Sequence, residues 1–432
     1  MCARAVLMHI VILSDTLPPE SPGGAGRIAW QLGRGLLAAG HQVTFITATE
    51  GQRRVETQQG IPVHFLYSNY PLRWQAWFGL VNPQTIRALN VLLRQLRPDI
   101  VHAHNVHQHL GYHSLVIARY ARAATVFTAH DVMPFAYAKL TAFIDPSRPD
   151  QCDSWNYRLP FGYNIRQARL RWNPARNLSI RHTMRYYVDE RVAVSRELKQ
   201  ALEANRLASF EVVHNGIDPD EFDVPEVMID AVRRRFQLKD RRVVLFGGRL
   251  THAKGDLQLL AALHRVKREV PNVALLVLAR SANYTRQLIH DNPDLVNEIV
   301  LGGWLEDTEL AAAYRVADVV ATPSVCFDSF PTVNLEGMAA GAPPVTTCFG
   351  GAHEAVIDGE TGFVVNPYNI DALADRLIRL LTDEPLHQRM AEAGRAHVRQ
   401  HFSLKHLTDA TLETYERALA KRRHRKKQPP SL

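Results

Sequence analysis

Residues 242–255 read RVVLFGGRLTHAKG and contain the pattern on which the fold of the chain depends. The run Val243–Phe246 is apolar, β-branched and short, which predicts a strand buried on both faces. Glycines and polar residues follow at once and end the strand. A helical pattern begins after Gly255. A strand, a loop and a helix in this order are half of a βαβ unit, so the stretch predicts a parallel sheet covered by helices.

The same alternation continues on both sides of this stretch. From Arg27 to Ala39, the residues Ile28, Leu32 and Leu36 share one helical face, and Gly40 ends the pattern. Strands are expected in the first half at His9–Leu13, Gln42–Thr47, Pro62–Tyr67, Ile100–His104, Thr125–Ala129, Arg191–Val194 and Glu211–His214. In the second half they are expected at Val243–Phe246, Val273–Leu278, Ile299–Leu301, Val319–Ala321, Pro344–Thr346 and Phe363–Val365.

The domain organisation follows from length and from one turn cluster. A chain of 432 residues is too long for one ordinary core, which favours two domains. The sequence NGIDP at 215–219 predicts the boundary, with an N-terminal domain at 1–215 and a C-terminal domain at 216–403. A last helix at 404–420 is expected to pack back on the first domain, followed by a basic tail at 421–432. The fold class is therefore α/β, with two Rossmann-like domains facing across a cleft and ligands at the carboxyl ends of the strands.

Composition excludes several classes of protein. Apolar residues make up 46% and charged residues 22% of the chain, which is the balance of a globular protein rather than of a disordered one. The chain contains no run of 18 apolar residues, so no membrane-spanning helix is predicted. The four cysteines form no CxxC pair, which argues against a zinc site and fits a reduced, cytoplasmic setting. The N-terminus lacks a signal-peptide cleavage site, and Met8 is an alternative start to Met1.

The net charge of +8 is unevenly distributed. The stretch 158–196 holds nine arginines and no lysine, and it overlaps a Pro-, Arg- and aromatic-rich segment at 134–177 that resembles an insertion between elements. The tail at 421–427 adds six more basic residues. Two local patches on an otherwise acidic chain suggest contact with an anionic surface or substrate rather than nucleic acid, for which no motif is present. Solvated charge on a helix face and a disordered tail remain the alternative.

A glycine-rich loop, Gly23-Gly24-Ala25-Gly26, precedes the first expected helix. Glycines let backbone amides approach an anion, and the helix N-terminus adds positive potential. Gly24, Gly26 and Ala29 also satisfy the dinucleotide fingerprint. About ten residues separate them from the strand, whereas a dinucleotide site needs its glycines directly after it, so NAD binding is disfavoured.

A second constellation consists of histidines. Four histidines fall within eight residues, at positions 102, 104, 107 and 109, which suggests a metal site. A loose histidine cluster at a strand end more often lines a polar surface without a metal. His130 ends the strand Thr125–Ala129, where ligand-contacting groups sit in α/β sheets. We expect no metal, and a histidine at 130 that can hydrogen-bond a substrate hydroxyl. A capped strand end is the alternative.

The loop after Val243–Phe246 carries Arg249 and Lys254. Arginine offers a planar fork for phosphate and lysine a point charge, so the two could neutralise a diphosphate without a metal ion. A P-loop is absent. Further along, Asp328 and Glu336 stand eight residues apart around Pro331. Pro331 suits a first helical turn, and the amides of Thr332 and Val333 would then be unpaired donors.

Taken together, these loops resemble the large retaining glycosyltransferase family of the family 4 type, with the GT-B fold. The resemblance covers roughly residues 8–402. It is carried by the early Gly-Gly loop and GHxV at 40–43, TxHD at 128–131, VS at 194–195, NGID at 215–218, GRLxxxKG at 248–255, and the E-x7-E box at 328–336. The first acid of the box is Asp328 rather than Glu, and the usual Gly-x-Gly of the donor domain is replaced by Ala279-Arg280-Ser281.

The resemblance implies a role for each matching residue. Arg249 and Lys254 hold the donor diphosphate, Glu336 binds ribose hydroxyls, and Asp328 touches the transferred sugar. The amides of Thr332 and Val333 meet phosphate. Gly303 and Trp304 lie near the base, Gly23 and Gly24 approach the reacting phosphate, and His130 contacts the sugar.

The activity implied is transfer of a sugar from a UDP- or GDP-type nucleoside-diphosphate sugar to a hydroxyl acceptor, with retention and with no cofactor or metal. The acceptor itself is unknown. A lipid-linked or cell-envelope polysaccharide precursor fits the basic patches, with the enzyme cytoplasmic and peripheral on an anionic membrane face. The alternatives are another GT-B enzyme, such as an epimerase or a phosphorylase, and a non-catalytic nucleotide-sugar binding module.

Overall fold

The computed structural model describes residues 7–18, 24–247, 250–278 and 283–427. The chain forms two compact units. The first contains the chain up to Ala138, Tyr157–Asn215 and the chain from Leu404 onward, and the second contains Lys139–Asn156 and Gly216–Ser403. The segment Lys139–Asn156 thus groups with the second unit, whereas the sequence analysis assigned all of 1–215 to the first domain.

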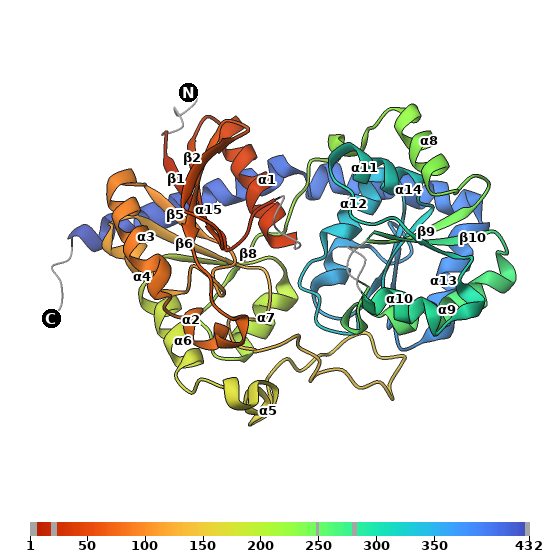
Figure 1. The fold of residues 1–432 in the computed structure, drawn as a ribbon, viewed down its shortest axis with the longest axis horizontal. Coiled ribbons are helices and arrows are strands. Elements are labelled where there is room, and N and C mark those ends of the chain that lie inside the picture. Colours follow the sequence, from red (N-terminus) through yellow and green to blue (C-terminus); the bar gives the residue numbers. More distant parts are fainter. Residues whose placement is uncertain (1–6, 19–23, 248–249, 279–282, 428–432) are drawn as a thin grey trace. The chain divides into compact units, whose positions relative to one another are not determined.

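The first unit is built on an eight-stranded sheet with the order β3-β4-β2-β1-β5-β6-β7-β8 (Figure 1). All neighbouring strands are parallel except β3, which runs antiparallel to β4. The strands are β1 His9–Leu13, β2 Gln42–Thr49, β3 Arg54–Gln58, β4 Ile61–Tyr67, β5 Ile100–Ala103, β6 Ala124–Ala129, β7 Glu190–Ala193 and β8 Glu211–Val212.

Helices cover this sheet because the apolar residues of its strands need burial on both faces. In α1, the residues Ile28, Leu32 and Leu36 are buried against the sheet in one core cluster. The helices are α1 Gly24–Ala38, α2 Gln75–Phe78, α3 Pro83–Leu96, α4 His113–Tyr120, α5 Tyr163–Ala168, α6 Arg176–Tyr186, α7 Arg196–Ala204 and α15 Leu404–Lys427, with short 3-10 helices η1 Leu72–Trp74 and η2 Arg169–Arg171.

The second unit has a six-stranded parallel sheet with the order β11-β10-β9-β12-β13-β14. The strands are β9 Arg242–Gly247, β10 Val273–Leu278, β11 Ile299–Leu301, β12 Val319–Thr322, β13 Pro344–Thr347 and β14 Phe363–Val365. The helices are α8 Glu226–Arg235, α9 Asp256–Glu269, α10 Asn283–His290, α11 Asp307–Val316, α12 Thr332–Ala340, α13 Ile370–Thr382 and α14 Glu384–His401, and the 3-10 helices are η3 Pro219–Phe222, η4 His252–Lys254, η5 Pro293–Leu295 and η6 Gly351–Ala355.

Every strand expected from the sequence is present in the structure, and β3 is the strand that the sequence analysis missed. It is a short edge strand whose side chains are exposed or half-buried, so it lacks the apolar pattern that marks the others. Its signal is the turn that follows it. Gln59 and Gly60 both have positive φ, at 48° and 81°, which matches the two-residue hairpin that joins antiparallel strands.

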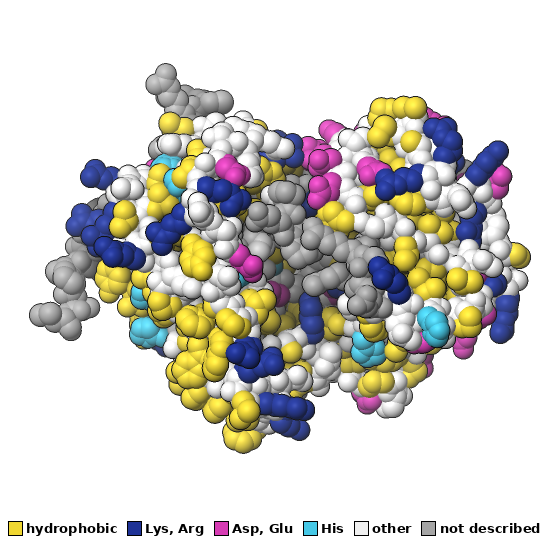
Figure 2. Space-filling model, viewed as in Figure 1, with side chains coloured by type: hydrophobic (Ala, Val, Ile, Leu, Met, Phe, Trp, Pro, Cys, Tyr) yellow, Lys and Arg dark blue, Asp and Glu magenta, His cyan; other side chains and the backbone are white. Residues whose placement is uncertain are grey.

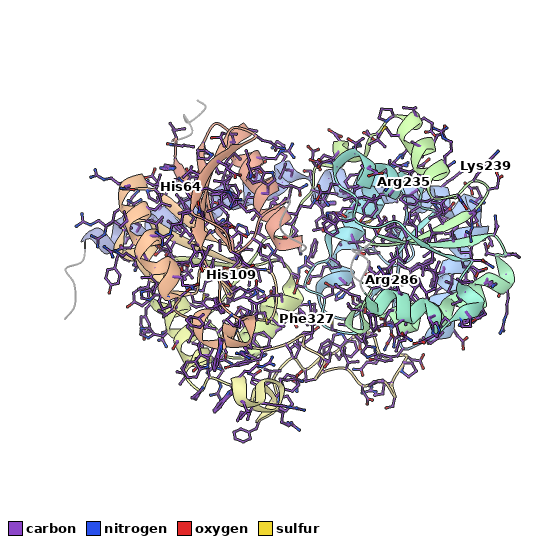
Figure 3. All side chains as sticks on the ribbon, in the orientation of Figure 1. His64, His109, Arg235, Lys239, Arg286 and Phe327 are labelled. Carbon is purple, nitrogen blue, oxygen red and sulfur yellow. The ribbon has the colours of Figure 1, made fainter. Side chains whose placement is uncertain are left out.

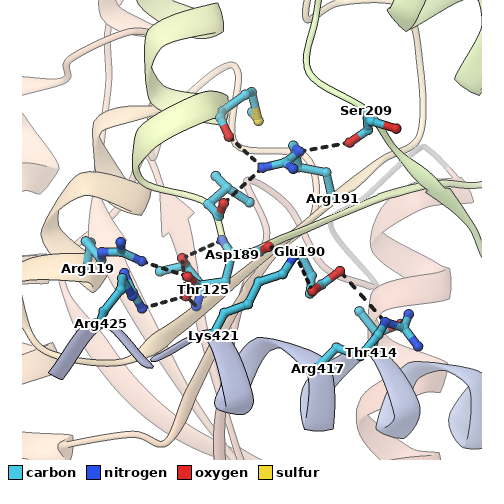
Figure 4. Close-up of polar contacts among 12 residues, drawn as sticks. Arg119, Thr125, Asp189, Glu190, Arg191, Ser209, Thr414, Arg417, Lys421 and Arg425 are labelled. Atoms are coloured by element: carbon cyan, nitrogen blue, oxygen red, sulfur yellow. Dashed lines mark hydrogen bonds and ion pairs between the residues drawn. The ribbon is translucent and has the colours of Figure 1, made fainter. Parts of the chain in front are cut away.

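The C-terminal helix α15 continues through most of the expected basic tail and is part of the first unit. Figure 4 shows the polar contacts between its basic side chains and the strand β7 region. Arg425 donates to the buried carboxylate of Asp189 at 2.8 Å, and Lys421 pairs with Glu190 at 2.8 Å. Arg119 completes the cluster with a 2.7 Å bond to Asp189. The expectation of a separate tail beginning at 421 is therefore wrong. The described basic residues belong to a helix because two buried carboxylates need positive partners.

None of the helices in the described ranges combines the length and the apolar character that a bilayer crossing requires.

Candidate functional site

The loop after β9 in the second unit is fixed by a close backbone contact. Gly255 has a φ of 77°, and a Cβ built there would lie 1.8 Å from the carbonyl oxygen of Pro323. The amide of Val325 donates to the carbonyl of Ala253 at 3.1 Å. Only glycine fits at 255, since any side chain would clash with the neighbouring loop. The β9–α9 loop therefore lies directly on the β12–α12 loop, which carries the predicted acid box.

This contact brings two predicted residues together. The Nζ of Lys254 lies 2.6 Å from Oδ2 of Asp328, and the Ser324 hydroxyl donates to the same oxygen at 2.7 Å. Burial would raise the pKa of Asp328, but the positive charges of Lys254 and Lys139 and the bond from Ser324 outweigh it and hold that pKa below its usual value. The pair is thus ionised at neutral pH and places a lysine ammonium at the carboxyl end of the sheet.

The segment Lys139–Asn156 contributes to the same region, which the sequence did not reveal. The amide of Phe327 donates to the carbonyl of Leu140 at 2.8 Å, and the Phe143 ring meets the Phe327 ring edge-on at 6.0 Å. Phe327 is labelled in Figure 3. A segment that lies far from the rest of the second unit in the sequence therefore supplies Lys139 and an aromatic lining to the loop around Asp328.

Asp328 is also fixed from the other side by Gly350. The two residues form an isolated parallel bridge, and the Gly351 amide donates to the Asp328 carbonyl at 2.8 Å. Gly350 has a φ of 72°, and a Cβ there would lie 2.5 Å from the Asp328 carbonyl oxygen. The signal in the sequence is the Gly-Gly pair that follows β13, a type of punctuation that marks a close backbone approach.

The N-terminus of α12 lies beside this pair in the sequence and begins where the analysis placed it. Pro331 is the N-cap residue and has no side-chain acceptor to offer, so the first amides of the helix, including those of Thr332 and Val333, are suited to an anion. A Cβ at Gly247 would meet the Tyr314 hydroxyl at 2.9 Å and Val333 at 3.0 Å. The end of β9 thus packs tightly against the first turn of α12.

Glu336 follows one turn later and is 4% exposed. Its carboxylate accepts a hydrogen bond from the buried hydroxyl of Tyr314. Tyr314 was not predicted, because nothing in its own helix pattern distinguishes it from a core aromatic residue. The contact orients the Glu336 carboxylate at the base of the α12 N-terminus.

A buried amide locks α12 onto the sheet. Asn334 accepts from the Thr322 hydroxyl at 2.8 Å and donates to the Thr346 hydroxyl at 3.0 Å and to the Ala352 carbonyl at 3.2 Å. These bonds join α12 to β12, β13 and η6, so the direction of the helix N-terminus is fixed. Asn334 was not predicted from the sequence, because its partners Thr346 and Ala352 come later in the chain.

The remaining predicted donor residues lie partly outside the described part of the chain. Arg249 and Gly23 fall outside the described residues, as does the Ala279-Arg280-Ser281 stretch. Gly303, with a φ of 72°, and Trp304, 40% exposed, follow β11. The Trp304 Nε1 donates to Glu306 at 2.7 Å. These predictions remain predictions.

In the first unit, the predicted histidine at the end of β6 belongs to a buried chain of polar rings. His130 Nε2 and His104 Nδ1 are 2.8 Å apart, and the two rings stack at 5.1 Å between centroids. His102 bonds Thr128 through Nε2 at 2.7 Å and Tyr415 through Nδ1 at 2.8 Å. The strands β5 and β6 and the helix α15 therefore position these rings together.

Burial keeps these rings neutral. It is the largest cause that lowers the pKa of His102 to about 3 and that of His130 to about 4, although Asp131 opposes the shift at His130. The pKa of His104 is also well below its ordinary value, for the same reason. A neutral imidazole both donates and accepts hydrogen bonds, which suits it to contact a hydroxyl-rich ligand.

The other two histidines of the sequence cluster go elsewhere. His107 lies 3.9 Å from Asp131, and His109, labelled in Figure 3, bonds the Ser68 hydroxyl at 3.0 Å. Within the described ranges, no group of three or more His, Cys, Asp or Glu side chains is arranged to hold a metal ion. Of the four histidines that form one cluster in the sequence, His102 and His104 thus pack together, with ring centroids 4.2 Å apart, whereas His107 and His109 have other partners.

Asp15 is a structural residue of the first unit that the sequence analysis missed. It follows β1, is buried, and accepts from the amides of Gln108, His109 and Leu110 at 2.7, 2.9 and 2.7 Å. Burial raises the pKa of Asp15, and this effect outweighs the lowering by the nearby His107 and by the bonds from the backbone amides. The carboxylate fixes the loop after β5. Gly24, the predicted phosphate-approaching residue, is the first residue of α1.

Two mostly parallel sheets covered by helices, with polar loops at the carboxyl ends of the strands, define an α/β protein of the kind that binds nucleotide-like ligands there. Two family models match the chain. The model of glycosyltransferase family 4 matches residues 22–221, and that of glycosyl transferases group 1 matches residues 228–397. The chain therefore belongs to the group 1 glycosyltransferases.

Relatives and solved structures agree with this assignment. The chain is 27% identical to a glycogen synthase of Mycobacterium tuberculosis over 448 residues, which span 98% of this chain and 97% of that protein. It is 32% identical over 196 residues, 44% of this chain and 51% of the relative, to a GDP-mannose-dependent alpha-(1-6)-phosphatidylinositol monomannoside mannosyltransferase of the same species. The structure of Anabaena HepE in complex with UDP and glucose superposes with a TM-score of 0.71 at 19% identity and covers 95% of this chain and 99% of its own. The fold is GT-B.

Proposed function

We propose that this glycosyltransferase transfers a sugar from a nucleoside-diphosphate sugar, and that the second unit binds the donor. The observation that carries the proposal is the ionised Lys254–Asp328 pair, at 2.6 Å, which joins the β9–α9 loop to the loop that leads to the N-terminus of α12, where no side chain caps the helix. An ammonium and a set of unpaired amides are the groups that bind a diphosphate. Glu336, one turn into the helix, is the carboxylate for the ribose hydroxyls.

The proposed chemistry needs positive charge rather than an acid or a base. Breaking the bond between the sugar and the diphosphate leaves negative charge on the phosphate oxygens, and fixed cations and helix dipoles aimed at that charge lower the barrier. Lys254 and Arg249 supply the cations, so we propose no divalent ion. Each is expected to contribute about 3 kcal/mol to transition-state stabilisation, as one oxyanion donor does.

We further propose that the reaction retains anomeric configuration. The leaving diphosphate departs from the same face of the sugar that the acceptor attacks, and a phosphate oxygen takes the acceptor proton, so no dedicated base is needed. Asp328 contacts the transferred sugar. His130, held neutral by burial, hydrogen-bonds a sugar hydroxyl.

The donor and acceptor classes are proposed from the relatives. One relative is named for GDP-mannose and one neighbour binds UDP and glucose, which supports a UDP- or GDP-type donor. The acceptor is a hydroxyl group, and we propose a lipid-linked or cell-envelope polysaccharide precursor at the cytoplasmic face of a membrane. A relative named for a phosphatidylinositol mannoside acceptor supports this choice.

A ligand panel tests the function directly. Thermal shifts with UDP-glucose, GDP-mannose and ADP-glucose identify the donor, and slow hydrolysis of the best donor in the presence of EDTA tests independence from metal. Proton NMR of the glycoside product reports its anomeric configuration. Stabilisation by one UDP- or GDP-sugar, EDTA-resistant turnover and an axial linkage from an axial donor are expected. Turnover of donor to an epimer without any acceptor would instead identify an epimerase.

A further inference from the structure

The first unit displays an exposed surface of apolar and arginine side chains around helix α5, which we call the α5 face. Phe161 and Leu170, at the two ends of this short helix, are 100% and 99% exposed. Ile165 within it and Trp172 after it are 44% and 36% exposed. Figure 2 shows hydrophobic side chains gathered over this lower part of the unit next to clusters of Lys and Arg. Side chains of this size at full exposure mark an interaction surface.

Polar contacts fix the base of this face, so its exposure is built into the fold. Asn164 and Asn177 both donate to the carbonyl of Phe135, at 2.9 and 2.8 Å. The Arg176 guanidinium stacks on the Tyr137 ring at 4.6 Å, and the Tyr137 hydroxyl donates to the Asn173 carbonyl at 2.9 Å. The segment is held without burying Phe161 or Leu170, which leaves both for an external partner.

Helix α2 extends the same face. The side chain of Asn173 donates to the carbonyl of Ala76 in α2 at 3.0 Å, so the two segments lie against each other. Trp74 and Trp77 of this neighbourhood are 45% and 48% exposed. Tryptophan is enriched at membrane–water interfaces, because its apolar ring can be buried in lipid while its N–H stays hydrated.

Charge on the α5 face has one sign. Arg166, Arg169 and Arg171 are all exposed among the apolar residues. No Asp or Glu occurs between Arg158 and Val188, or between Thr57 and Pro98. Both segments of the face therefore present only positive charge to a partner. Arginine stems lie along apolar surface while their guanidinium groups reach phosphate, which allows the two kinds of side chain to act together.

We propose that the α5 face docks the enzyme on an anionic lipid bilayer, with Phe161 and Leu170 inserted among the acyl chains and the arginines at the headgroups. The proposal rests on the membrane-borne acceptor of the proposed function and names the surface that reaches it. A second copy of this chain fits poorly, because two such faces would oppose arginine to arginine. Nucleic acid fits poorly too, because Leu170 and Ile165 gain nothing from phosphates or bases, whereas hydrocarbon buries them.

Vesicle flotation of the full-length protein tests the docking surface. Binding is measured to vesicles of phosphatidylcholine with 40% phosphatidylglycerol (about this fraction mimics a strongly anionic leaflet) and to vesicles of phosphatidylcholine alone. We expect binding to the anionic vesicles, weakened by salt, and at least about tenfold weaker binding to the neutral ones. The double variant Phe161→Glu with Leu170→Glu should lose at least about tenfold in affinity. The triple variant of Arg166, Arg169 and Arg171 to Gln should abolish the salt dependence.

Controls separate this inference from the proposed function. Val227→Glu changes a 66% exposed apolar residue of the second unit and should bind vesicles like the wild type. The Phe161/Leu170 variant should keep the wild-type melting temperature and the wild-type hydrolysis of the donor, since both residues are exposed. Unchanged vesicle binding by that variant would overturn the α5 face while leaving the glycosyltransferase proposal intact. Absence of vesicle binding by the wild type, or a dimer in sedimentation that the variant abolishes, would overturn it too.

Discussion

The two units treat their polar groups in opposite ways at the carboxyl ends of their strands. In the second unit, Lys254 and Asp328 stay ionised because they lie 2.6 Å apart and each stabilises the other. In the first unit, His102, His104 and His130 stay neutral because burial removes them from water, and at His130 this effect outweighs the opposing charge of Asp131. Under the proposed function, the charged environment binds the diphosphate and the neutral one contacts the sugar.

Removal of the Lys254 ammonium is expected to have the largest effect, because it takes away the charge that distinguishes the second unit's loops from those of the first. Lys254→Ala should lower turnover about 10²–10³-fold, because a cation that meets charge developed in the transition state is lost. The loss should appear mainly in kcat rather than in KM for the acceptor. Lys405→Ala, at an exposed ion pair of the first unit, is the matched control and should leave turnover unchanged. Full activity in Lys254→Ala would remove the basis of the proposed mechanism.

The loop that positions Lys254 can be disturbed without touching any charge. Gly255→Ala forces a Cβ toward the Pro323 carbonyl at a φ of 77°, and it should cost about 2–4 kcal/mol of stability from strain and overpacking. Gly359→Ala is the control, because its φ is 76° and no atom lies within 4 Å of the added Cβ, so it should cost only about 1 kcal/mol. Urea unfolding of both variants measures the difference, and equal losses would show that the close approach to Pro323 does not exist.

The neutral histidines predict an acid-sensitive first unit. A histidine with a folded pKa of about 3 binds fewer protons than the unfolded chain once the pH falls below the ordinary value of 6.5. Stability is therefore full above pH 6.5 and falls with the pH down to about 3, with a loss near 2 kcal/mol at pH 5 from His102 alone (roughly 1.4 kcal/mol per unit).

His102→Gln should be less stable at pH 7, since it loses the bonds to Thr128 and Tyr415, yet its stability should change less between pH 7 and pH 5. Urea unfolding at the two pH values measures both. An unaltered slope in His102→Gln would mean that His102 is charged in the folded protein.

The smallest expected effect concerns the C-terminal helix. Arg425→Ala removes one of two arginines that hold the buried carboxylate of Asp189, and it should cost about 1 kcal/mol. Arg423→Ala, an exposed neighbour on the same helix, should change stability by less than about 0.5 kcal/mol. Thermal melting at matched pH checks both. An Arg425→Ala variant as stable as the wild type would show that the contact between Arg425 and Asp189 does not attach the helix end to the first unit.

Much of the fold was predictable because buried parallel strands leave a strong local signal. Thirteen apolar runs predicted thirteen strands, and β3 escaped because an exposed edge strand needs no apolar run. The basic helix end misled in the other direction. A row of lysines and arginines looks solvated in sequence, and only the fold shows that Asp189 and Glu190 are buried beside it.

The positions of Lys254, Asp328 and His130 in loops after strands were predictable, because each follows an apolar run, whereas their roles stay predictions. Residues that act through distant partners were missed. Asn334, Tyr314 and Asp15 each bond groups that only the completed sheet brings near. The protonation states of the buried histidines and of Asp328 could not be predicted from the sequence, because burial and ion pairing determine them rather than residue type. The exposure of Phe161 and Leu170 was hidden for a related reason, because an apolar residue in a sequence normally indicates core.

A crystal structure with the nucleoside diphosphate of the donor bound tests the central claim most directly. The account predicts a phosphate oxygen within hydrogen-bonding distance of Lys254 Nζ, another at the amides of Thr332 or Val333, and ribose hydroxyls at Glu336. A diphosphate bound away from Lys254 and from the N-terminus of α12 would contradict it.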